Sequence, residues 1–348
     1  MALSREAWGE TPSGAPIIAY HLTNSAGTEV VVLNYGCTIK NIFVADKSGN
    51  RVDVVLGYDE CKGYFDNDCF LGATVGPTAN RIANARYTID GKEFVLPIND
   101  GPNNLHTDMN NGFHKRVWDA EEGDNYVKFS LKSEDGDLGF SGNRVFELTY
   151  TLSEDNALQL HYHATSDAKT LMNLTNHAYF NLGGHKSGKC LDHVMKMNSS
   201  AYTPVIDSAA IPTGEIATVE GTPFDFRQEK TLGKDIEADN AQLKFVGGYD
   251  HNYVVDGADG SLREFCSVSS PDTGITMKCS TTLPGFQLYT GNFLNNVQGG
   301  KEGAVYGRRD GFCLETQFYP NSVNQANFPD PIYGPDREYD TVTVYQFV

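Results

Sequence analysis

The side chains best suited to proton transfer in this sequence are one glutamate and two histidines. Glu315 lies in a run of apolar and aromatic residues between Phe312 and Pro320. A carboxylate in such surroundings either has a charged partner or has a raised pKa, and raised values cluster at functional sites. His177 lies among amides and aromatic residues, and His106 follows a Gly-Pro turn. Because a single histidine is more often structural than catalytic, these three residues are candidates and not yet assigned catalytic residues.

A second group of residues has the chemistry of a sugar-binding pocket. A glycine-rich run presents Asn80 and Arg81 together, and planar amide and guanidinium groups form forked hydrogen bonds to vicinal hydroxyls. An ion pair between Arg81 and one of the many carboxylates is the simpler structural explanation. Other residues of this kind follow bends or lie in aromatic segments: Tyr179, Asp250, Phe286 and Gln287. Aromatic faces combined with a few amides are typical of pockets that hold pyranose rings.

Two further patterns suggest phosphate or metal binding but do not fit in detail. The stretch 183–190 resembles a phosphate-binding loop, but it ends in Cys190, where serine or threonine would bind magnesium, and no helical pattern follows. His161 and His163 lie on one face of an expected strand. No third metal ligand is near them in sequence, so a hydrogen-bonded face is favoured. We therefore expect neither a metal ion nor an organic cofactor.

The residues that position these side chains are expected to form strands, because alternation of apolar and polar residues is the recurrent pattern. Leu158, Leu160 and Tyr162, for example, alternate with Gln159 and His161. A hairpin is predicted around Asp90-Gly91, and two short helical turns at 59–65 and 229–239. Further strands are predicted at 17–22, 29–33, 39–45, 51–56, 126–131, 144–152, 275–280 and 342–348.

The organisation of the chain favours one domain. Long helical periodicity, internal repeats and linkers are absent, and 35 of the 348 residues are glycine, which suits a protein rich in turns. We expect residues 1–348 to form a single all-β domain, a large sandwich of antiparallel sheets with few short helices.

Charge and cysteine usage limit the partners and the compartment. The formal net charge is −18, and such a chain repels phosphate backbones and anionic membrane surfaces. We therefore expect neither nucleic acid nor a membrane as a partner. The seven cysteines are irregularly spaced and form no Cys-x-x-Cys pair, which favours free thiols in a reducing compartment. The N-terminal residues do not resemble a signal peptide, so a cytoplasmic location is predicted.

Eight segments, in order along nearly the whole chain, resemble the aldose 1-epimerase (galactose mutarotase) family. They are 34–38, 57–59, 79–83, 104–106, 175–182, 250–252, 284–287 and 314–317. Each is weakly specific alone, whereas the ordered set is highly specific. The resemblance implies a galactose mutarotase-like supersandwich with a sugar cleft on one sheet face. The chain departs from the family at Pro77-Thr78, where a basic residue is usual, and at Thr107-Asp108, where two glycines are frequent.

The resemblance also implies roles for individual residues. Glu315 is expected to be the general base and ionised, His177 the general acid, and His106 an assistant at the ring oxygen. The residues expected to bind sugar are Asn80, Arg81, Tyr179, Asp250 and Gln287, with Phe286 stacking on the ring. Such an enzyme opens the ring of a free aldohexose such as galactose or glucose and recloses it to the other anomer, without a cofactor.

Three alternatives differ in what they require. A hexose-6-phosphate 1-epimerase needs a cluster of basic residues, and only Arg81 stands in the cleft segments. A non-catalytic sugar-binding protein is expected to lack Glu315 or His177, and both are present. A polysaccharide lyase or hydrolase can share a sandwich fold, but it needs a longer open cleft. The preferred aldose and the oligomeric state, monomer or dimer, are not indicated by the sequence.

Overall fold

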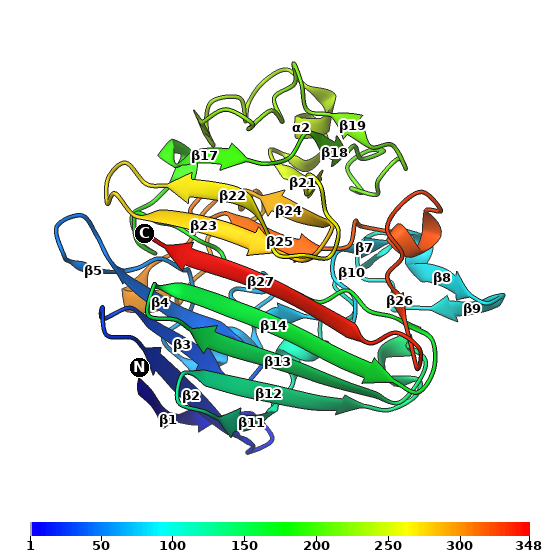
Figure 1. The fold of residues 1–348 in the computed structure, drawn as a ribbon, viewed down its shortest axis with the longest axis horizontal. Coiled ribbons are helices and arrows are strands. Elements are labelled where there is room, and N and C mark those ends of the chain that lie inside the picture. Colours follow the sequence, from blue (N-terminus) through cyan, green and yellow to red (C-terminus); the bar gives the residue numbers. More distant parts are fainter. Residues whose placement is uncertain (1) are drawn as a thin grey trace.

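The computed structural model describes residues 2–348 and consists mainly of antiparallel strands (Figure 1). These residues contain only two α-helices, α1 (Cys61–Phe65) and α2 (Ala241–Val246), together with short 3-10 turns. In the described part of the chain, no helix combines the length and apolarity needed to cross a lipid bilayer. The expectation of an all-β fold with few short helices is confirmed.

Two large sheets contain most of the strand residues. The N-terminal sheet has its strands in chain order: β1 (Ala2–Glu10), β2 (Pro16–Thr23), β3 (Glu29–Leu33), β4 (Ile39–Ala45) and β5 (Arg51–Asp53). A nine-stranded sheet has the order β11 (Asp119–Glu122), β12 (Tyr126–Ser133), β13 (Arg144–Leu152), β14 (Ala157–Ser166), β27 (Tyr339–Phe347), β23 (Thr276–Thr281), β22 (Arg263–Ser269), β17 (Val194–Met197) and β20 (Lys230–Thr231). The C-terminal strand β27 therefore joins the two halves of the chain by pairing with β14 and β23.

A third sheet and four short ribbons complete the fold. The third sheet has the order β19 (Ala217–Thr218), β18 (Ala201–Thr203), β21 (Asp250–Val254), β24 (Gly285–Tyr289) and β25 (Cys313–Gln317). The two-stranded ribbons pair β6 (Thr74–Val75) with β16 (Thr175–Asn176), β7 (Arg81–Ile82) with β10 (Asn104–Leu105), β8 (Arg86–Ile89) with β9 (Lys92–Val95), and β15 (Thr170–Leu171) with β26 (Ile332–Tyr333).

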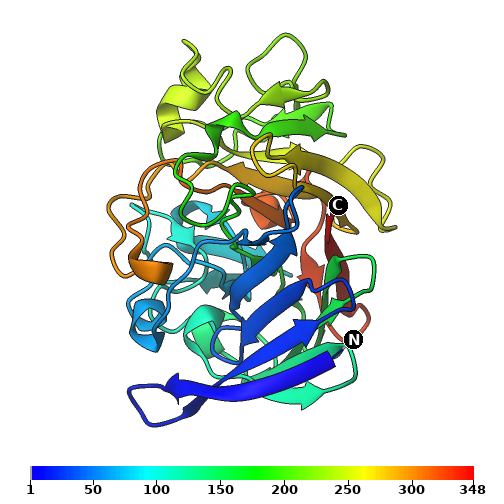
Figure 2. The same ribbon diagram turned by 90° about the vertical axis from the view of Figure 1, so that its left-hand side faces the viewer.

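The main core lies between the nine-stranded sheet and the other two sheets, which Figures 1 and 2 show behind it and beside it. Tyr20 of the N-terminal sheet packs on Phe129 of β12, with ring centroids 5.5 Å apart. Phe286 of β24 packs on Phe265 of β22 at 4.3 Å. Alternate residues of each strand supply these contacts because successive side chains of a strand point to opposite faces. The opposite face of the third sheet is left to build a site.

The strand predictions largely agree with the structure, and one helix prediction is wrong. β3, β4 and β13 have the predicted bounds, and β8 and β9 form the predicted hairpin. His161 Nε2 lies 2.9 Å from Asp340 Oδ1, and His163 lies beside Glu147 and Glu338, as expected of a hydrogen-bonded face.

Residues 229–239 are not helical: they contain β20 followed by turns. Leu232 and Ile236 are both buried there, and their four-residue spacing imitates a helical repeat. The helix begins later, at Ala241, where the Asn240 side chain accepts a hydrogen bond from the Gln242 backbone N–H.

Candidate active site

The site is built on one face of the third sheet, where alternate side chains of neighbouring strands point in the same direction. β21, β24 and β25 are neighbours, and their register places Gln287 opposite Glu315 and Asp250 opposite Tyr289. These side chains point away from the main core, whereas Phe286 and its alternates point into it. Three strands that are distant in sequence therefore bring two carboxylates and an amide onto one face.

The stacking role expected of Phe286 is wrong. Its ring is fully buried in the main core, stacked on Tyr253 at 5.5 Å and packed against Phe265. Adjacent residues of a strand face opposite sides of a sheet, so Phe286 and Gln287 cannot both face a cleft. The aromatic wall of the site comes instead from Tyr179 and Tyr289, whose ring centroids lie 5.9 Å apart.

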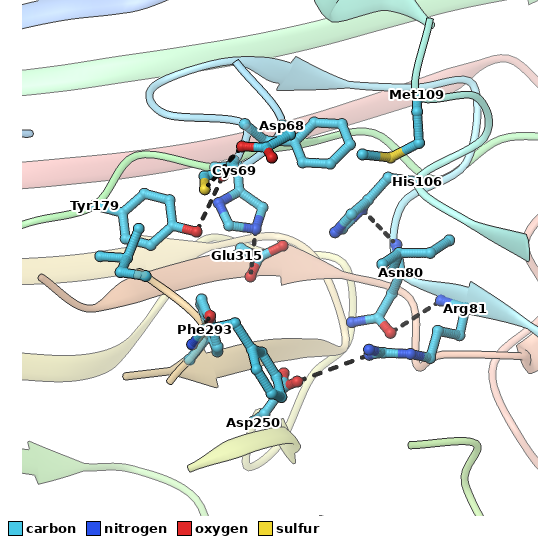
Figure 3. Close-up of a pocket in the computed structure, with 15 residues that line it drawn as sticks. Asp68, Cys69, Asn80, Arg81, His106, Met109, Tyr179, Asp250, Phe293 and Glu315 are labelled. Atoms are coloured by element: carbon cyan, nitrogen blue, oxygen red, sulfur yellow. Dashed lines mark hydrogen bonds and ion pairs between the residues drawn. The ribbon is translucent and has the colours of Figure 1, made fainter. Parts of the chain in front are cut away.

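A cavity of about 300 Å³ lies on this face, at the small end of the range of ligand pockets. Figure 3 shows side chains from several elements converging on Glu315. The lining includes seven of the nine residues selected from the sequence: Asn80, Arg81, His106, His177, Tyr179, Asp250 and Glu315. Gln287 is not among the lining residues, and its contact with a sugar stays a prediction.

The centre of the cavity holds the three proton-transfer candidates. His177 Nε2 lies 3.6 Å from Glu315 Oε1, and the rings of His106 and His177 are 5.3 Å apart at an angle of 83°. Glu315 is 2% exposed, and its Oε2 atom has no hydrogen-bond partner. A buried oxygen left without a partner is costly in a folded protein and is available to a ligand.

Burial sets the protonation of this cluster. It raises the pKa of Glu315 well above the usual value, and the nearby Asp250 charge raises it further. Burial also lowers the pKa of His177 to about 4 and holds that of His106 well below its usual value. Burial therefore disfavours both the ionised carboxylate that the sequence led us to expect of Glu315 and a charged His177.

Two loops present Asn80 and His106 in a strained backbone conformation. The φ angles of Asn80 and His106 are 57° and 52°, in the left-handed region that non-glycine residues rarely adopt. The His106 backbone N–H donates to the Asn80 carbonyl, and the Asn80 backbone N–H donates to His106 Nδ1. Because Nδ1 accepts, a neutral His106 carries its proton on Nε2. Strain of this kind is characteristic of functional sites.

Thr107, one of the departures from the family pattern, is held by hydrogen bonds to the backbone of Thr78. Thr107 has a φ of 69°, which glycine adopts readily and threonine does not. Its hydroxyl donates to the Thr78 carbonyl and accepts from the Thr78 backbone N–H, at 2.8 and 3.0 Å. The Thr107 carbonyl also accepts from the Asn104 amide at 2.6 Å. These three bonds hold the loop beside His106 in the conformation that glycine would allow.

Arg81 is held between two carboxylates. Its Nε donates to Asp100 Oδ2 at 2.8 Å, and its NH1 lies 3.8 Å from Asp250 Oδ2 (Figure 3). The structural explanation considered for Arg81 therefore applies, and it is compatible with sugar binding because the guanidinium still lines the cavity. Burial raises the pKa of Asp250, while Arg81 and the amide of Gln287 oppose that shift.

Gln317, which was not among the residues predicted from the sequence, links the amides beneath the cavity. It accepts from the Asn80 side chain at 3.3 Å and donates to Gln287 Oε1 and Asn252 Oδ1. Gln287 then donates to Asp250 Oδ1 at 2.7 Å. The sequence contained a signal that could have identified Gln317, because this residue ends one of the eight family-like segments and shares a strand face with Glu315.

Phe70 and His114 were also missed as supports of the cluster. The Phe70 ring lies 4.8 Å from that of His106, 4.5 Å from that of His114 and 5.8 Å from that of His177. His114 Nε2 lies 3.2 Å from the Met109 carbonyl, in a loop that lines the cavity. No alternation or known motif distinguished these residues, because their contacts arise between loops.

His106, His177 and Glu315 are also a possible metal-binding set. One ligand atom from each lies within 4.8 Å of the others. Zinc–ligand bonds of about 2.1 Å bring tetrahedral ligands to about 3.4 Å from one another, so this set would have to contract around an ion. The same distances suit a sugar whose hydroxyls bridge the three groups.

Comparisons with known proteins agree with this geometry. The family model described as aldose 1-epimerase matches residues 19–346. The chain is 41% identical to galactose mutarotase of Bos taurus, over 100% of this chain and 99% of the bovine chain. It is 37% identical to aldose 1-epimerase of Escherichia coli K12, over 97% of both chains.

Two solved structures have the same fold. An aldose epimerase homologue from C. elegans superposes with a TM-score of 0.85 at 32% identity, covering 94% of this chain and 98% of that one. Galactose 1-epimerase of Lactobacillus acidophilus NCFM has a TM-score of 0.86 at 28% identity, covering 100% and 99%. The galactose mutarotase-like sandwich is thereby confirmed, and the chain belongs to the aldose 1-epimerase family.

Proposed function

We propose that this protein interconverts the α and β anomers of free aldohexoses, with galactose and glucose as substrates. The observation that carries the proposal is the placement of Glu315 and His177 3.6 Å apart in a cavity lined by amides, carboxylates and aromatic rings. A group that takes a proton beside a group that gives one is what ring opening requires. The names of the relatives, galactose mutarotase and aldose 1-epimerase, support the same reaction.

The proposed reaction opens and recloses the sugar ring. Glu315 takes the proton of the hydroxyl on C1, His177 gives a proton to the ring oxygen, and the C1–O5 bond breaks to leave the free aldehyde. Rotation about C1–C2 presents the other carbonyl face. Closure then returns each proton, so Glu315 and His177 exchange roles between the two half-reactions. His106 assists at the ring oxygen, where its Nε2–H can donate.

The proposal requires one transferable proton on the pair in each half-reaction. Burial favours the arrangement in which this proton lies on Glu315, because it disfavours both charged forms. A sugar hydroxyl that donates to Glu315 stabilises the ionised carboxylate and thereby shifts the proton to His177. Substrate binding thus prepares the base and the acid together.

The binding roles follow from the lining of the cavity. We assign Asn80, Arg81 and Asp250 to the sugar hydroxyls and Tyr179 to the apolar face of the ring. Gln287 acts through Asp250, which its amide holds at 2.7 Å. Arg81 is the only lysine or arginine in the lining, beside three carboxylates. This balance favours a neutral sugar over a hexose phosphate.

We also propose that residues 1–348 act as one domain in the reducing environment of the cytoplasm. The seven free thiols support this compartment. The charge of −18 supports a small neutral partner rather than nucleic acid or a membrane surface. Because a proton donor and a proton acceptor suffice for the reaction, no metal or organic cofactor is expected.

Polarimetry of freshly dissolved α-D-galactose and α-D-glucose tests the proposal. The expected result is a faster approach, proportional to protein concentration, to the same final rotation that the sugar reaches alone. The ratio of the two rates measures the preference between the sugars, and α-D-glucose 6-phosphate in a parallel assay measures the rival activity. Curves that overlay the spontaneous rate at high protein concentration would remove the catalytic proposal.

A further inference from the structure

The ring of His177 is contacted at both nitrogens by side chains of one strand. Cys313 and Glu315 are two residues apart on β25, so they point to the same face of the third sheet, separated by about 6.4–6.8 Å along the strand. His177 Nδ1 lies 3.5 Å from Cys313 Sγ, and His177 Nε2 lies 3.6 Å from Glu315 Oε1. The proposed mechanism uses the contact with Glu315 and leaves the contact with the thiol without a role.

The main chain of His177 is fixed by hydrogen bonds to the segment 72–73. Its backbone N–H donates to the Ala73 carbonyl at 2.8 Å, and its carbonyl accepts from the Gly72 N–H at 3.1 Å. These bonds place Cβ but leave the ring able to turn over about the Cβ–Cγ bond. A half turn would bring ring carbons to face both the sulfur and the carboxylate. The contact between Nδ1 and Sγ therefore selects the orientation that directs Nε2 toward Glu315.

The remaining neighbours of the His177 ring are other rings. The centroids of four of them lie 5.0–6.1 Å away, those of Phe70, His106, Tyr179 and Tyr289. Among residues 2–348, Cys313 is the one side chain that forms a hydrogen bond with Nδ1, and Glu315 is the one carboxylate within 4 Å of a ring nitrogen. Cys313 is fully buried, so water does not compete for this contact.

The proposed proton transfers decide which atom donates in the thiol contact. A sugar hydroxyl on Glu315 shifts a proton to His177, which then gives a proton to the ring oxygen. Both steps use Nε2, which must therefore begin without a hydrogen. A neutral imidazole carries one hydrogen, so this hydrogen lies on Nδ1, and Nδ1–H donates to Cys313 Sγ. If the thiol donated instead, Nε2 would already be protonated and could not accept from Glu315.

Sulfur suits this position because it is a weak acceptor. Burial and the nearby charge of Glu315 hold the pKa of the Cys313 thiol well above its usual value, so the thiol stays uncharged. A carboxylate in its place would stabilise the imidazolium and raise the pKa of His177, which burial lowers to about 4. A neutral sulfur orients the ring without binding its proton more tightly, so the imidazolium remains a strong acid toward the ring oxygen.

We propose that Cys313 is a positioning residue: its sulfur accepts the Nδ1–H of His177, fixes that tautomer and ring orientation, and reserves Nε2 for proton exchange with Glu315 and the sugar. This inference rests on the proposed function and assigns a role in it to a residue that does not line the cavity. No bond to sulfur forms or breaks. The proton on Nδ1 stays in place through both half-reactions, and each proton taken up at Nε2 is later returned.

Nuclear magnetic resonance of the isotopically labelled, sugar-free protein tests the tautomer directly. Long-range proton–nitrogen correlation spectra distinguish a protonated from a bare ring nitrogen and Nδ1 from Nε2. His177→Gln removes one of the nine histidines and thereby identifies the signals of His177. The expected result at neutral pH is a protonated Nδ1 and a bare Nε2. A wild-type His177 that carries its hydrogen on Nε2 contradicts the inference.

Variants of Cys313 separate the hydrogen bond from packing. Cys313→Ala and Cys313→Val both remove the acceptor, and valine also fills the space. Each is expected to lower kcat for glucose by about 10–100-fold, less than the roughly 10⁴-fold that a carboxylate contributes by orienting a catalytic imidazole. KM should stay within about threefold of wild type, because Cys313 does not line the cavity.

Two further variants serve as rescue and control. Cys313→Ser keeps an acceptor and is expected to restore kcat to within about fivefold of wild type. Cys279→Ala truncates another fully buried thiol, on β23 and outside the site, so it is the matched control. It should lower the Tm and leave kcat unchanged. Thermal unfolding of every variant shows that the measured protein is folded.

The two levels of the proposal fail in different ways. An inactive wild-type protein contradicts the proposed function, and with it the reaction that gives the Nδ1 proton its role. An active wild-type protein with an equally active Cys313→Ala contradicts only the positioning role. Recovery of activity in Cys313→Val also contradicts it, because volume alone would then matter. A Cys313→Ser variant as slow as Cys313→Ala contradicts the acceptor role of the sulfur.

Discussion

Replacing Glu315 with glutamine is expected to remove activity and to stabilise the protein. Glu315 is 2% exposed, its Oε2 atom has no partner, and its pKa is raised by burial and by Asp250. Loss of one positioned proton-transfer group costs about 10²–10⁴-fold in rate, which corresponds to about 2.7–5.4 kcal/mol of barrier. The glutamine amide carries no charge, and its N–H can donate to His177, whose Nε2 lies 3.6 Å from Glu315 Oε1.

The gain in stability is expected to depend on pH. A buried oxygen without a partner costs about 1–3 kcal/mol, and the charge adds to this cost only when the carboxylate must ionise. Because the folded pKa of Glu315 lies above its unfolded value, the folded state binds more protons between these two values. Wild-type stability from this group is therefore greatest below the unfolded pKa near 4.5 and declines as the pH rises through the folded pKa.

The assay combines polarimetry with thermal unfolding at several pH values. Glu315→Gln is expected to have a Tm about 2 °C or more above wild type at pH 8, and the difference should shrink toward pH 4.5. Glu264→Gln, on the exposed side of β22, is the control that changes neither activity nor Tm. A variant that is less stable than wild type at every pH, or that keeps kcat within about tenfold, refutes the reasoning.

Three further predictions concern the cluster and its supports. The pH profile of kcat/KM, corrected for the spontaneous reaction, should be bell-shaped, because one proton must reside on the Glu315–His177 pair. Activity should fall below about pH 4, where His177 also gains a proton, and should fall again above the raised pKa of Glu315. A profile with a single limb would contradict this assignment. Thr107→Val keeps the side-chain volume but loses the hydrogen bonds to Thr78, so it should lower the unfolding free energy measured in urea by about 1–3 kcal/mol. Thr107→Gly should lower it by less, because glycine relieves the positive φ. The reverse order of the two variants would show that the hydroxyl is unimportant. Phe286→Ala should lower the unfolding free energy by about 3–5 kcal/mol and leave the KM of the folded fraction nearly unchanged, whereas a large rise in KM would restore its sugar-stacking role.

Much of the fold was predictable because its strands are half-buried. In β14 the buried residues Leu158, Leu160, Tyr162 and Ala164 alternate with partly exposed residues, and this period of two is written in the sequence. Segments without this pattern were missed, including β1 and β11, whose residues are mostly or wholly exposed. The helix wrongly predicted at 229–239 is the opposite error. Buried residues spaced four apart suggested a helix there, but this spacing arises in turns.

The identity of the central residues also came from the sequence, through their order and neighbours. Glu315, His177, His106, Asn80, Arg81, Tyr179 and Asp250 all line one cavity. Gln287 and Phe286 do not line it, and Phe286 was chosen by its chemical type although its position on β24 directs it into the core. Alternation could have excluded it, since the adjacent Gln287 was predicted to contact the same sugar and neighbouring residues of a strand point to opposite faces.

The sequence by itself determined the residue types, the β periodicity and the family, because these depend on local order along the chain. Only the tertiary structure decided how the groups affect one another. The raised pKa of Glu315 depends on burial by segments far away in sequence, and the support of His106 by Phe70 and Thr107 depends on contacts between loops. The contact between Cys313 and His177 likewise forms only where two distant segments meet. Such through-space effects have no linear pattern, because they are set by which distant segments pack together.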